Sequence, residues 1–183
     1  MRLYRQTVEE FGLYNGAELD EDRFQKLQIS AGELSAKMRA VRILGMTNIA
    51  KSDLQRRLIQ KGENPEHAKA AVEWMTELDL LDDRKTAATI VDSCIRKGYG
   101  VNRAKEVLHE KRIPKELWQE ALEDYPEQLD KIEEFLCKRL SRDSSDKDIR
   151  RAVDALMRRG HSYYRIKRVL DTLDFDTEDL PEE

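Results

Sequence analysis

The sequence is poor in residues that interrupt or cross-link secondary structure, with 8 glycines, 4 prolines and 2 cysteines among 183 residues. Aromatic residues make up only 7% of the chain. β-Sandwiches need frequent turns, and collagen-like or low-complexity chains need far more glycine and proline, so these classes are excluded. No apolar run approaches the roughly 18 residues of a membrane span. We therefore expect a soluble, cytoplasmic protein with no membrane partner.

The patterns of metal sites and disulfides are also missing. Cys94 and Cys137 form no CxxC pair and have helical apolar neighbours, which favours two reduced core residues. His67, His109 and His161 lie far apart in the sequence, so we expect each to be solvated or to cap a helix instead of binding metal. The sequence predicts no metal site and no cofactor.

Catalytic motifs are absent as well. The sequence has no GxxxxGK[ST] loop, no HExxH and no GxSxG. Asp82 and Asp83 are interpreted as the start of a helix, where acids complement the helix dipole. Trp118 falls on an apolar stripe and is expected in a core, whereas Trp74 suits core packing and base stacking about equally. We expect a protein that is not an enzyme.

Charged residues make up 38% of the chain, and they are segregated although the net charge is only −4. Residues 37–62, 89–112 and 138–170 carry +6, +3 and +7, with acidic stretches of −4 and −6 between them. Such alternation is typical of an internal repeat.

A direct comparison demonstrates the repeat. Residues 90–108 and 152–170 share eight identities in nineteen positions without a gap, and a weaker copy begins near residue 40. Apolar residues recur at helical spacing throughout, and no segment alternates as a strand does. The sequence therefore predicts an all-α fold, with tandem three-helix repeats forming an elongated, curved body.

The predicted organisation has five parts. An N-terminal acidic segment with a short helix covers 1–36, three repeats cover 37–88, 89–130 and 131–173, and an acidic tail covers 174–183. Glycine is favoured just after a helix, and Asn or Ser just before one. The sequence places these signals at Gly62, Gly98, Gly160, Asn64 and Ser145.

Basic side chains cluster around the predicted joints between helices. Residues 155–170 contain five bases and no acid, whereas an ordinary solvated face mixes both signs. The joints at Gly98 and Gly160 are both basic, so we expect contacts with nucleic-acid phosphates and not with base edges. The candidate contact residues are Arg56, Arg57, Lys61, Arg96, Lys97, Arg103, Lys105, Arg158, Arg159, Arg165, Lys167 and Arg168.

Three motifs follow one another along the chain: LQRRLIQKG, LLDDRKTAATIVDSCIRKGYGVNRAKEVLHEKRI and LMRRGHSYYRIKRVL. Together they give residues 37–173 a resemblance to the RecX family of bacterial regulatory proteins. The resemblance implies a protein that binds the RecA recombinase filament on single-stranded DNA. It also implies inhibition of the filament's ATPase, strand exchange and co-protease activities in recombination, DNA repair and the SOS response. RecA and DNA phosphates within the filament would be its partners, and we expect a monomer.

The chain departs from the family pattern at three positions. Thr86 stands where an aromatic residue is common, Arg112 where glycine is common, and His161 where phenylalanine is common. All three are packing or turn positions, so the departures concern local geometry.

Two other functions stay open. A direct DNA-binding regulator would use residues 47–62, TNIAKSDLQRRLIQKG, as a helix-turn-helix recognition region, although clear base-reading side chains are missing there. An interaction scaffold would bind protein equally well with and without nucleic acid.

The predicted shape is directly measurable. Repeats that contact only their neighbours should give a radius of gyration well above that of a globule. A compact domain of this length is expected near ~16 Å. Small-angle X-ray scattering that returned a value close to the compact one would contradict the elongated body.

Overall fold

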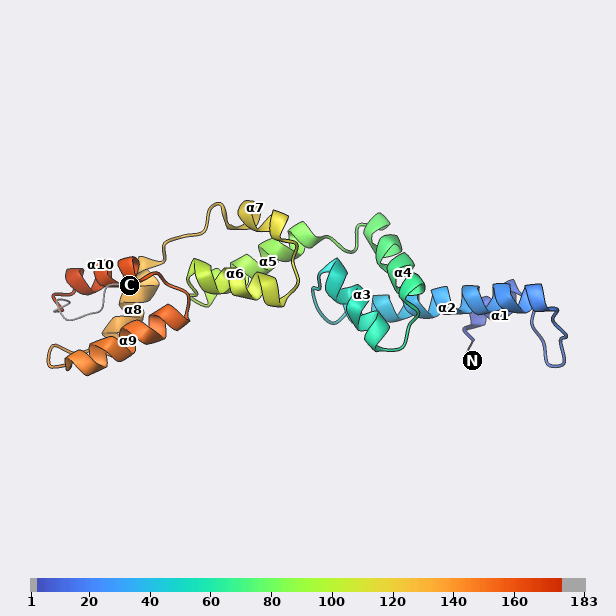
Figure 1. Cartoon of the computed structure of the whole chain (residues 1–183), viewed down its shortest axis with the longest axis horizontal. Coiled ribbons are helices and arrows are strands. Elements are labelled where there is room, and N and C mark those ends of the chain that lie inside the picture. Colours follow the sequence, from blue (N-terminus) through green and yellow to red (C-terminus); the bar gives the residue numbers. More distant parts are fainter. Residues whose placement is uncertain (1–2, 176–183) are drawn as a thin grey trace. The chain divides into compact units, whose positions relative to one another are not determined.

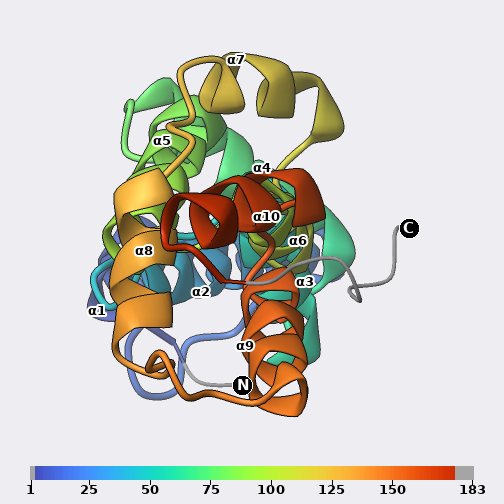
Figure 2. The same ribbon diagram turned by 90° about the vertical axis from the view of Figure 1, so that its left-hand side faces the viewer.

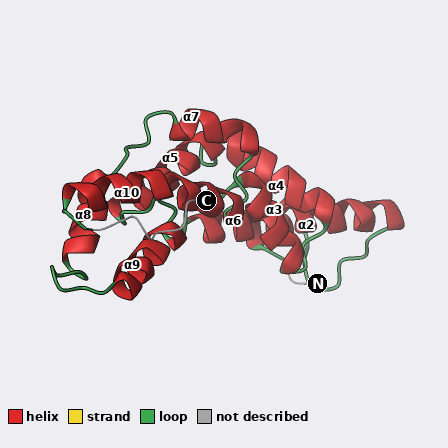
Figure 3. Ribbon diagram, turned by 60° about the vertical axis from the view of Figure 1, so that its left-hand side comes forward, coloured by secondary structure: helices red, strands yellow, loops and turns green. Residues whose placement is uncertain are grey.

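The computed structural model describes residues 3–175, and throughout this range the elements are helices, with no strand (Figure 3). The all-α prediction is therefore confirmed. The predicted acidic tail lies outside the described residues from position 176 onward. The chain divides into two compact units, one ending at Asp83 and the other beginning at Arg84.

The first unit is built on one long helix. Its elements are α1 (Arg5–Glu10), α2 (Glu21–Leu44), α3 (Lys51–Gln60) and α4 (Pro65–Glu77). α2 packs against both α3 and α4, which also pack on each other (Figure 1). Ala36 and Ala40 on α2 are fully buried against Leu54, Leu58 and Met75. Small side chains on α2 thus let the other two helices approach closely.

The second unit contains the remaining helices. They are α5 (Asp83–Arg96), α6 (Val101–Glu110), the 3₁₀ turn η1 (Lys115–Leu117), α7 (Trp118–Leu122), α8 (Leu129–Cys137), α9 (Asp146–Arg158) and α10 (Tyr163–Thr172). α8, α9 and α10 surround one apolar core, which includes Ile132, Leu136, Leu156 and Ile166 (Figure 2).

The predicted helix ends are confirmed where local chemistry sets them. The Asn64 side chain accepts a hydrogen bond from the Glu66 amide, and Ser145 accepts one from the Asp148 amide. Gly62, Gly98 and Gly160 follow α3, α5 and α9 with φ of 90°, 66° and 85°. Residues other than glycine rarely adopt this left-handed backbone conformation. It allows the next amides to donate hydrogen bonds back to carbonyls of the helix.

The predicted repeat boundaries differ from the helix bounds. The boundaries at 36/37, 88/89 and 130/131 fall inside α2, α5 and α8. Identical residues in the repeats begin partway along a helix, so a boundary drawn where the likeness begins cuts that helix. The N-terminal segment correspondingly holds the short α1 and most of the 24-residue α2. The division into three repeats stays a prediction.

The expectation for the cysteines was half correct. Cys94 is buried, but Cys137 is exposed, and both are free thiols. Cys137 is the last residue of α8, whose buried positions are Ile132 and Leu136, so the sulfur falls off the apolar face. The prediction that Cys137 is a core residue is therefore wrong.

In the second unit, the joint between α5 and α6 lies directly against the joint between α9 and α10. The Gly100 amide donates to the Arg159 carbonyl at 2.8 Å, and the Asn102 amide donates to the Gly160 carbonyl at 3.3 Å. Amides at the start of α6 thereby pair with carbonyls at the end of α9, two sets of groups that helices leave unsatisfied. A Cβ at Gly100 would overlap the Gly160 carbonyl, so glycine alone fits this contact.

We predict that Gly100→Ala destabilises the second unit by at least about 3 kcal/mol, because the added methyl group must push two backbones apart. Gly100 has φ of −72°, so alanine adds no backbone strain of its own there. Urea unfolding monitored by Trp118 fluorescence, in a Trp74→Phe background, reports on this unit alone.

Gly62→Ala is the matched control. Gly62 has φ of 90°, and a Cβ there would meet nothing within 4 Å, so only backbone strain of about 1 kcal/mol is expected. That loss should be seen by Trp74 in the first unit, measured in a Trp118→Phe background. Equal losses for the two substitutions would contradict the close packing of the joints.

Candidate nucleic-acid interface

The two paired joints bring basic side chains from three helices around one cavity of about 340 Å³. Arg96 ends α5 and Lys97 follows it, Arg159 follows α9, and one base lies on α8 while another directly follows that helix. The charged residues that line the cavity are Arg96, Lys97, Lys131, Glu134, Lys138 and Arg159. Five bases and one acid of the described residues thus share one site, where an anion is strongly favoured.

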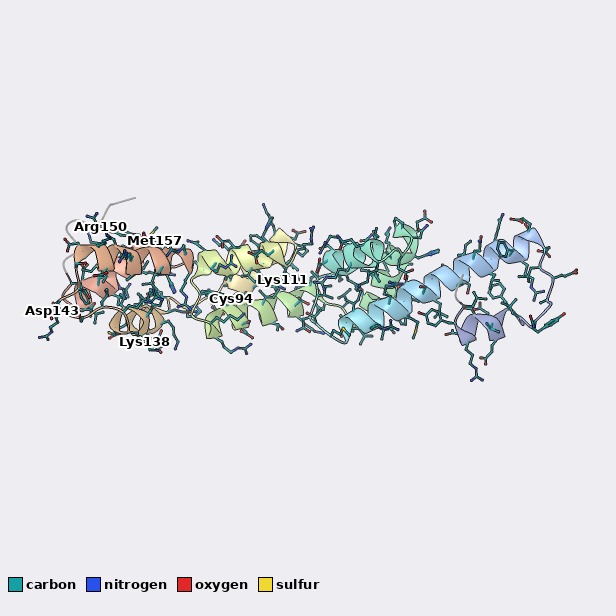
Figure 4. All side chains as sticks on the ribbon, turned by 90° about the horizontal axis from the view of Figure 1, so that it is seen from below. Cys94, Lys111, Lys138, Asp143, Arg150 and Met157 are labelled. Atoms are coloured by element: carbon teal, nitrogen blue, oxygen red, sulfur yellow. The ribbon has the colours of Figure 1, made fainter. Side chains whose placement is uncertain are left out.

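Contacts with α5 hold α8 beside this cavity. The Gln128 side-chain amide donates to the Ile95 carbonyl at 3.4 Å, which ties the start of α8 to the end of α5. A Cβ built on Gly98 would lie 3.6 Å from the Lys131 side chain, so the stem of this lysine runs across the glycine. Phe135 and Lys138 follow on the same helix face, and Figure 4 labels Lys138.

Aromatic rings hold Arg159 in place. Its guanidinium carbon lies 5.3 Å from the Phe135 ring centre and 5.9 Å from that of Tyr99, within cation–π range. The Tyr125 hydroxyl donates to the Tyr99 carbonyl at 2.6 Å. Burial raises the pKa of Tyr125 to about 12, so this hydroxyl keeps its proton near neutral pH. The two rings therefore hold the Arg159 guanidinium group in a defined position beside the cavity.

His161 links the same two joints and is buried, so the expectation that it is solvated or caps a helix is wrong. Its Nε2–H donates to the Gly98 carbonyl at 3.0 Å, and Nδ1 has no partner within residues 3–175. Burial lowers the pKa of His161, the bond to Gly98 opposes this, and Arg159 and Arg165 lower the pKa further. The side chain is accordingly a neutral connector.

Five of the candidate contact residues are exposed and have no ion pair within residues 3–175. Arg96 and Lys97 line the cavity, whereas Lys61, Lys105 and Arg158 do not. Lys167, also without an ion pair in this range, is half-buried on α10. Arg96 and Lys97 are thus the candidates whose charge is both available and focused at the cavity.

The arginines of α3 are neutralised within their own helix. Arg56 and Arg57 contact the buried Asp53 carboxylate at 2.7 and 2.9 Å. Burial raises the pKa of Asp53, but the two arginines outweigh it, so the pKa lies below its ordinary value. Lys61 is exposed where α3 ends, and its carbonyl accepts from Arg39 at 3.1 Å.

Two further candidates on α6 lie beside acids. Arg103 pairs with Glu106 at 2.7 Å and with Glu110 at 3.1 Å. Lys105 lines a different cavity, between α6 and α7, with Trp118 and three glutamates. Trp118 is half-buried, and its indole N–H donates to the Ile113 carbonyl at 3.0 Å.

Two of the three candidates on α10 share one carboxylate. Glu127, in the connection before α8, lies 3.5 Å from Arg165 and 3.4 Å from Arg168. The five bases between residues 155 and 170 are therefore not one open patch, because two of them contact Glu127.

Sequence reasoning missed three residues of the cavity, namely Lys131 and Phe135 on α8 and Lys138 directly after it. Lys131 lies in a stretch with a charge of −6, and that sum hid it. Lys138 begins the +7 stretch but lies outside the basic run at 155–170. The spacing of the three residues, four and then three, places them on one helix face, and this signal could have found them.

Neither a metal site nor a membrane span is found in the part of the chain that the structure describes. No group of three or more His, Cys, Asp or Glu side chains there is arranged to hold a metal ion. None of its helices combines the length and apolar character needed to cross a bilayer.

Two known proteins with a similar sequence carry the same name. A Vibrio parahaemolyticus protein called "Regulatory protein RecX" is 26% identical over 156 residues, which cover 84% of this chain and 99% of that protein. An Escherichia fergusonii protein of the same name is 34% identical over 96 residues, or 47% of this chain and 58% of that protein. No protein-family model matches the chain.

Two solved structures with the same fold carry that name too. The "Crystal structure of regulatory protein RecX" matches with a TM-score of 0.75 and 19% identity, covering 92% of this chain and 88% of that one. RecX from Lactobacillus salivarius matches with a TM-score of 0.69 and 21% identity, covering 79% and 98%. Both likenesses show a shared fold.

We predict that the second unit loses stability as the pH falls below about 6.5, because the unfolded chain binds a proton that folded His161 disfavours. A lowered folded pKa gives stability that is complete above the ordinary value and is lost on acidification. The loss attributable to His161 is at most about 1.4 kcal/mol per pH unit. Urea unfolding at pH 7.5, 6.5 and 5.5 measures it. His161→Phe should flatten the dependence, and equal slopes in both proteins would refute this role.

Proposed function

Because the chain belongs to the RecX family of regulatory proteins, we propose that it binds the RecA filament on single-stranded DNA and inhibits its ATPase, strand exchange and co-protease activities. It acts by binding and not as an enzyme, in recombination, DNA repair and the SOS response. The family supports a regulatory role, and the partner and the inhibition are the proposal.

The cavity at the paired joints supports this proposal most directly. Arg96 and Lys97 are exposed there without an ion pair in the described part of the chain, beside Arg159 on its aromatic rings. A concave cluster of bases attracts the phosphates of a nucleic acid and is far less selective for base identity. Such a site suits a regulator that must recognise a filament on any sequence.

The helix-turn-helix alternative receives less support from α3. Arg56 and Arg57 contact Asp53, and Leu54 and Leu58 are fully buried in the core of the first unit. A recognition helix needs side chains free to reach base edges in the major groove. Both arginines would have to leave a buried carboxylate, which is unfavourable.

The proposal predicts that Arg96→Glu with Lys97→Glu removes most of the inhibition of filament ATPase. Losing two charge-assisted contacts should raise the half-inhibitory concentration by more than about tenfold. Both side chains are exposed, so helicity and melting should change little. The measurement is steady-state ATP hydrolysis by the host RecA on single-stranded DNA, titrated with each protein.

Arg142→Glu with Lys147→Glu is the control, since it makes the same charge change at exposed positions of the same unit, away from the cavity. It should shift inhibition by less than about twofold, as expected for screened charges. Binding to bare single strand, duplex and nucleotide-stabilised filament separates the alternatives. A protein that binds duplex as tightly as filament would support the direct DNA-binding regulator. Equal binding to RecA with and without DNA would support the scaffold.

A further inference from the structure

Glu134 stands out because, of the described residues that line the basic cavity, it alone carries a carboxylate. One of its oxygens lies 2.6 Å from the Lys138 ammonium group, and the other lies 3.2 Å from that of Lys131. Hydrogen bonds from Lys138 and then Lys131 hold the pKa of Glu134 below its usual value. The carboxylate therefore stays ionised between two cations.

This arrangement leaves room for a stronger anion. The side chains of Lys131, Glu134 and Lys138 are 45%, 49% and 70% exposed. Exposed ion pairs of this kind contribute little stability and exchange readily with solvent and ions. Arg96, Lys97 and Arg159 line the same cavity and have no ion pair within residues 3–175, so three further cations are available to an incoming ligand.

The aromatic residue of the cavity is not available to a nucleic-acid base. The Arg139 guanidinium carbon lies 4.3 Å from the Phe135 ring centre, and that of Arg159 lies 5.3 Å from it. Base stacking needs an open ring face, and two guanidinium groups compete for the faces of this ring. The cavity accordingly offers charge and donors, which phosphate groups use, and not a stacking platform.

We propose that this cavity is a binding site for adjacent phosphate groups, and that Glu134 occupies the anion position between Lys131 and Lys138 until a phosphate displaces it. α8 thus supplies part of the site, together with the joints. The inference deepens the proposed function and rests on it for the source of the phosphates, the backbone of single-stranded DNA. A free polyphosphate offers the same chemistry, so the experiment includes both.

The first test removes the competing carboxylate. Binding of a fluorescent 20-nucleotide oligo(dT) to the full chain is measured by anisotropy at low salt, for Glu134→Gln and for Glu133→Gln. Glu133 is the exposed neighbour, does not line the cavity and gives the same change in net charge. Glu134→Gln should bind about fivefold more tightly than Glu133→Gln, because one charge about 4 Å from a phosphate changes the energy by about 1 kcal/mol in water.

The second test removes the two lysines. Lys131→Gln with Lys138→Gln should weaken binding and lower the slope of log affinity against log salt by about 1.4, since each phosphate contact to a single strand contributes about 0.7. Arg142→Gln with Lys147→Gln, the matched control away from the cavity, should leave the slope within about 0.3 of the wild type. If the double variant melts early, Lys138→Gln alone at its more exposed position should lower the slope by about 0.7.

The source of the phosphates is decided by competition. Oligo(dT) should displace the probe at concentrations well below those of inorganic tripolyphosphate or ATP. The reverse order would overturn the assignment of the ligand to DNA. Equal affinities of Glu134→Gln and Glu133→Gln, or an unchanged salt slope in the lysine variants, would overturn the site itself.

These binding measurements contain no recombinase, so their outcome does not depend on whether the proposed function is right. A protein that shows the expected binding changes but leaves filament ATPase untouched would contradict the proposed function and retain the phosphate site. If the protein inhibits the ATPase but the lysine variants bind oligo(dT) with no loss of affinity, the phosphate site is contradicted and the proposed function is retained.

Discussion

The close contact between the backbones of Gly100 and Gly160 is the constraint on which the candidate site depends. Two helix joints meet there with no side chain between them, and amides at the start of α6 bond to carbonyls at the end of α9. His161 adds a third link through the Gly98 carbonyl. Because these bonds fix one joint against the other, the bases that flank each joint are fixed around one cavity.

The intramolecular ion pairs then decide which bases can act on a partner. Asp53 neutralises the arginines of α3, and Glu127 contacts two on α10. The count of bases in a stretch of sequence therefore overstates the positive charge that faces outward. Among the bases without a carboxylate partner, Arg96, Lys97 and Arg159 lie where α5, α8 and α9 meet. They lie beside Lys131 and Lys138, whose carboxylate partner Glu134 is exposed.

Sequence reasoning predicted the elements well because helix ends depend on neighbouring residues. Gly98 and Gly160 end helices through a left-handed backbone conformation set by their own segments, and Ser145, directly before α9, caps it by accepting from the Asp148 amide. Arg112 takes the same left-handed conformation, with φ of 59°, where the family commonly has glycine. Local signals of this kind can be read without knowing the fold.

The site was only partly predictable, because its geometry comes from residues far apart in the chain. The repeat marked Arg96, Lys97 and Arg159 as residues that flank two basic joints. The repeat could not show that the joints touch. That contact joins positions about sixty residues apart, and no pattern in the sequence marks it. Glu127 was likewise invisible as the partner of Arg165 and Arg168, because that pairing follows from how the chain turns between α7 and α8.

The two cysteines, which differ in exposure, make the cavity accessible to chemistry without any mutation. Cys137 is an exposed free thiol and precedes Lys138 directly, whereas Cys94 is buried and burial raises its pKa. Reaction with a maleimide requires a thiolate in contact with solvent, so reagents distinguish the two sulfurs. A single dye or photo-crosslinker can thus be attached to the unmodified chain at the residue that directly precedes Lys138, where it would report on whatever approaches that lysine.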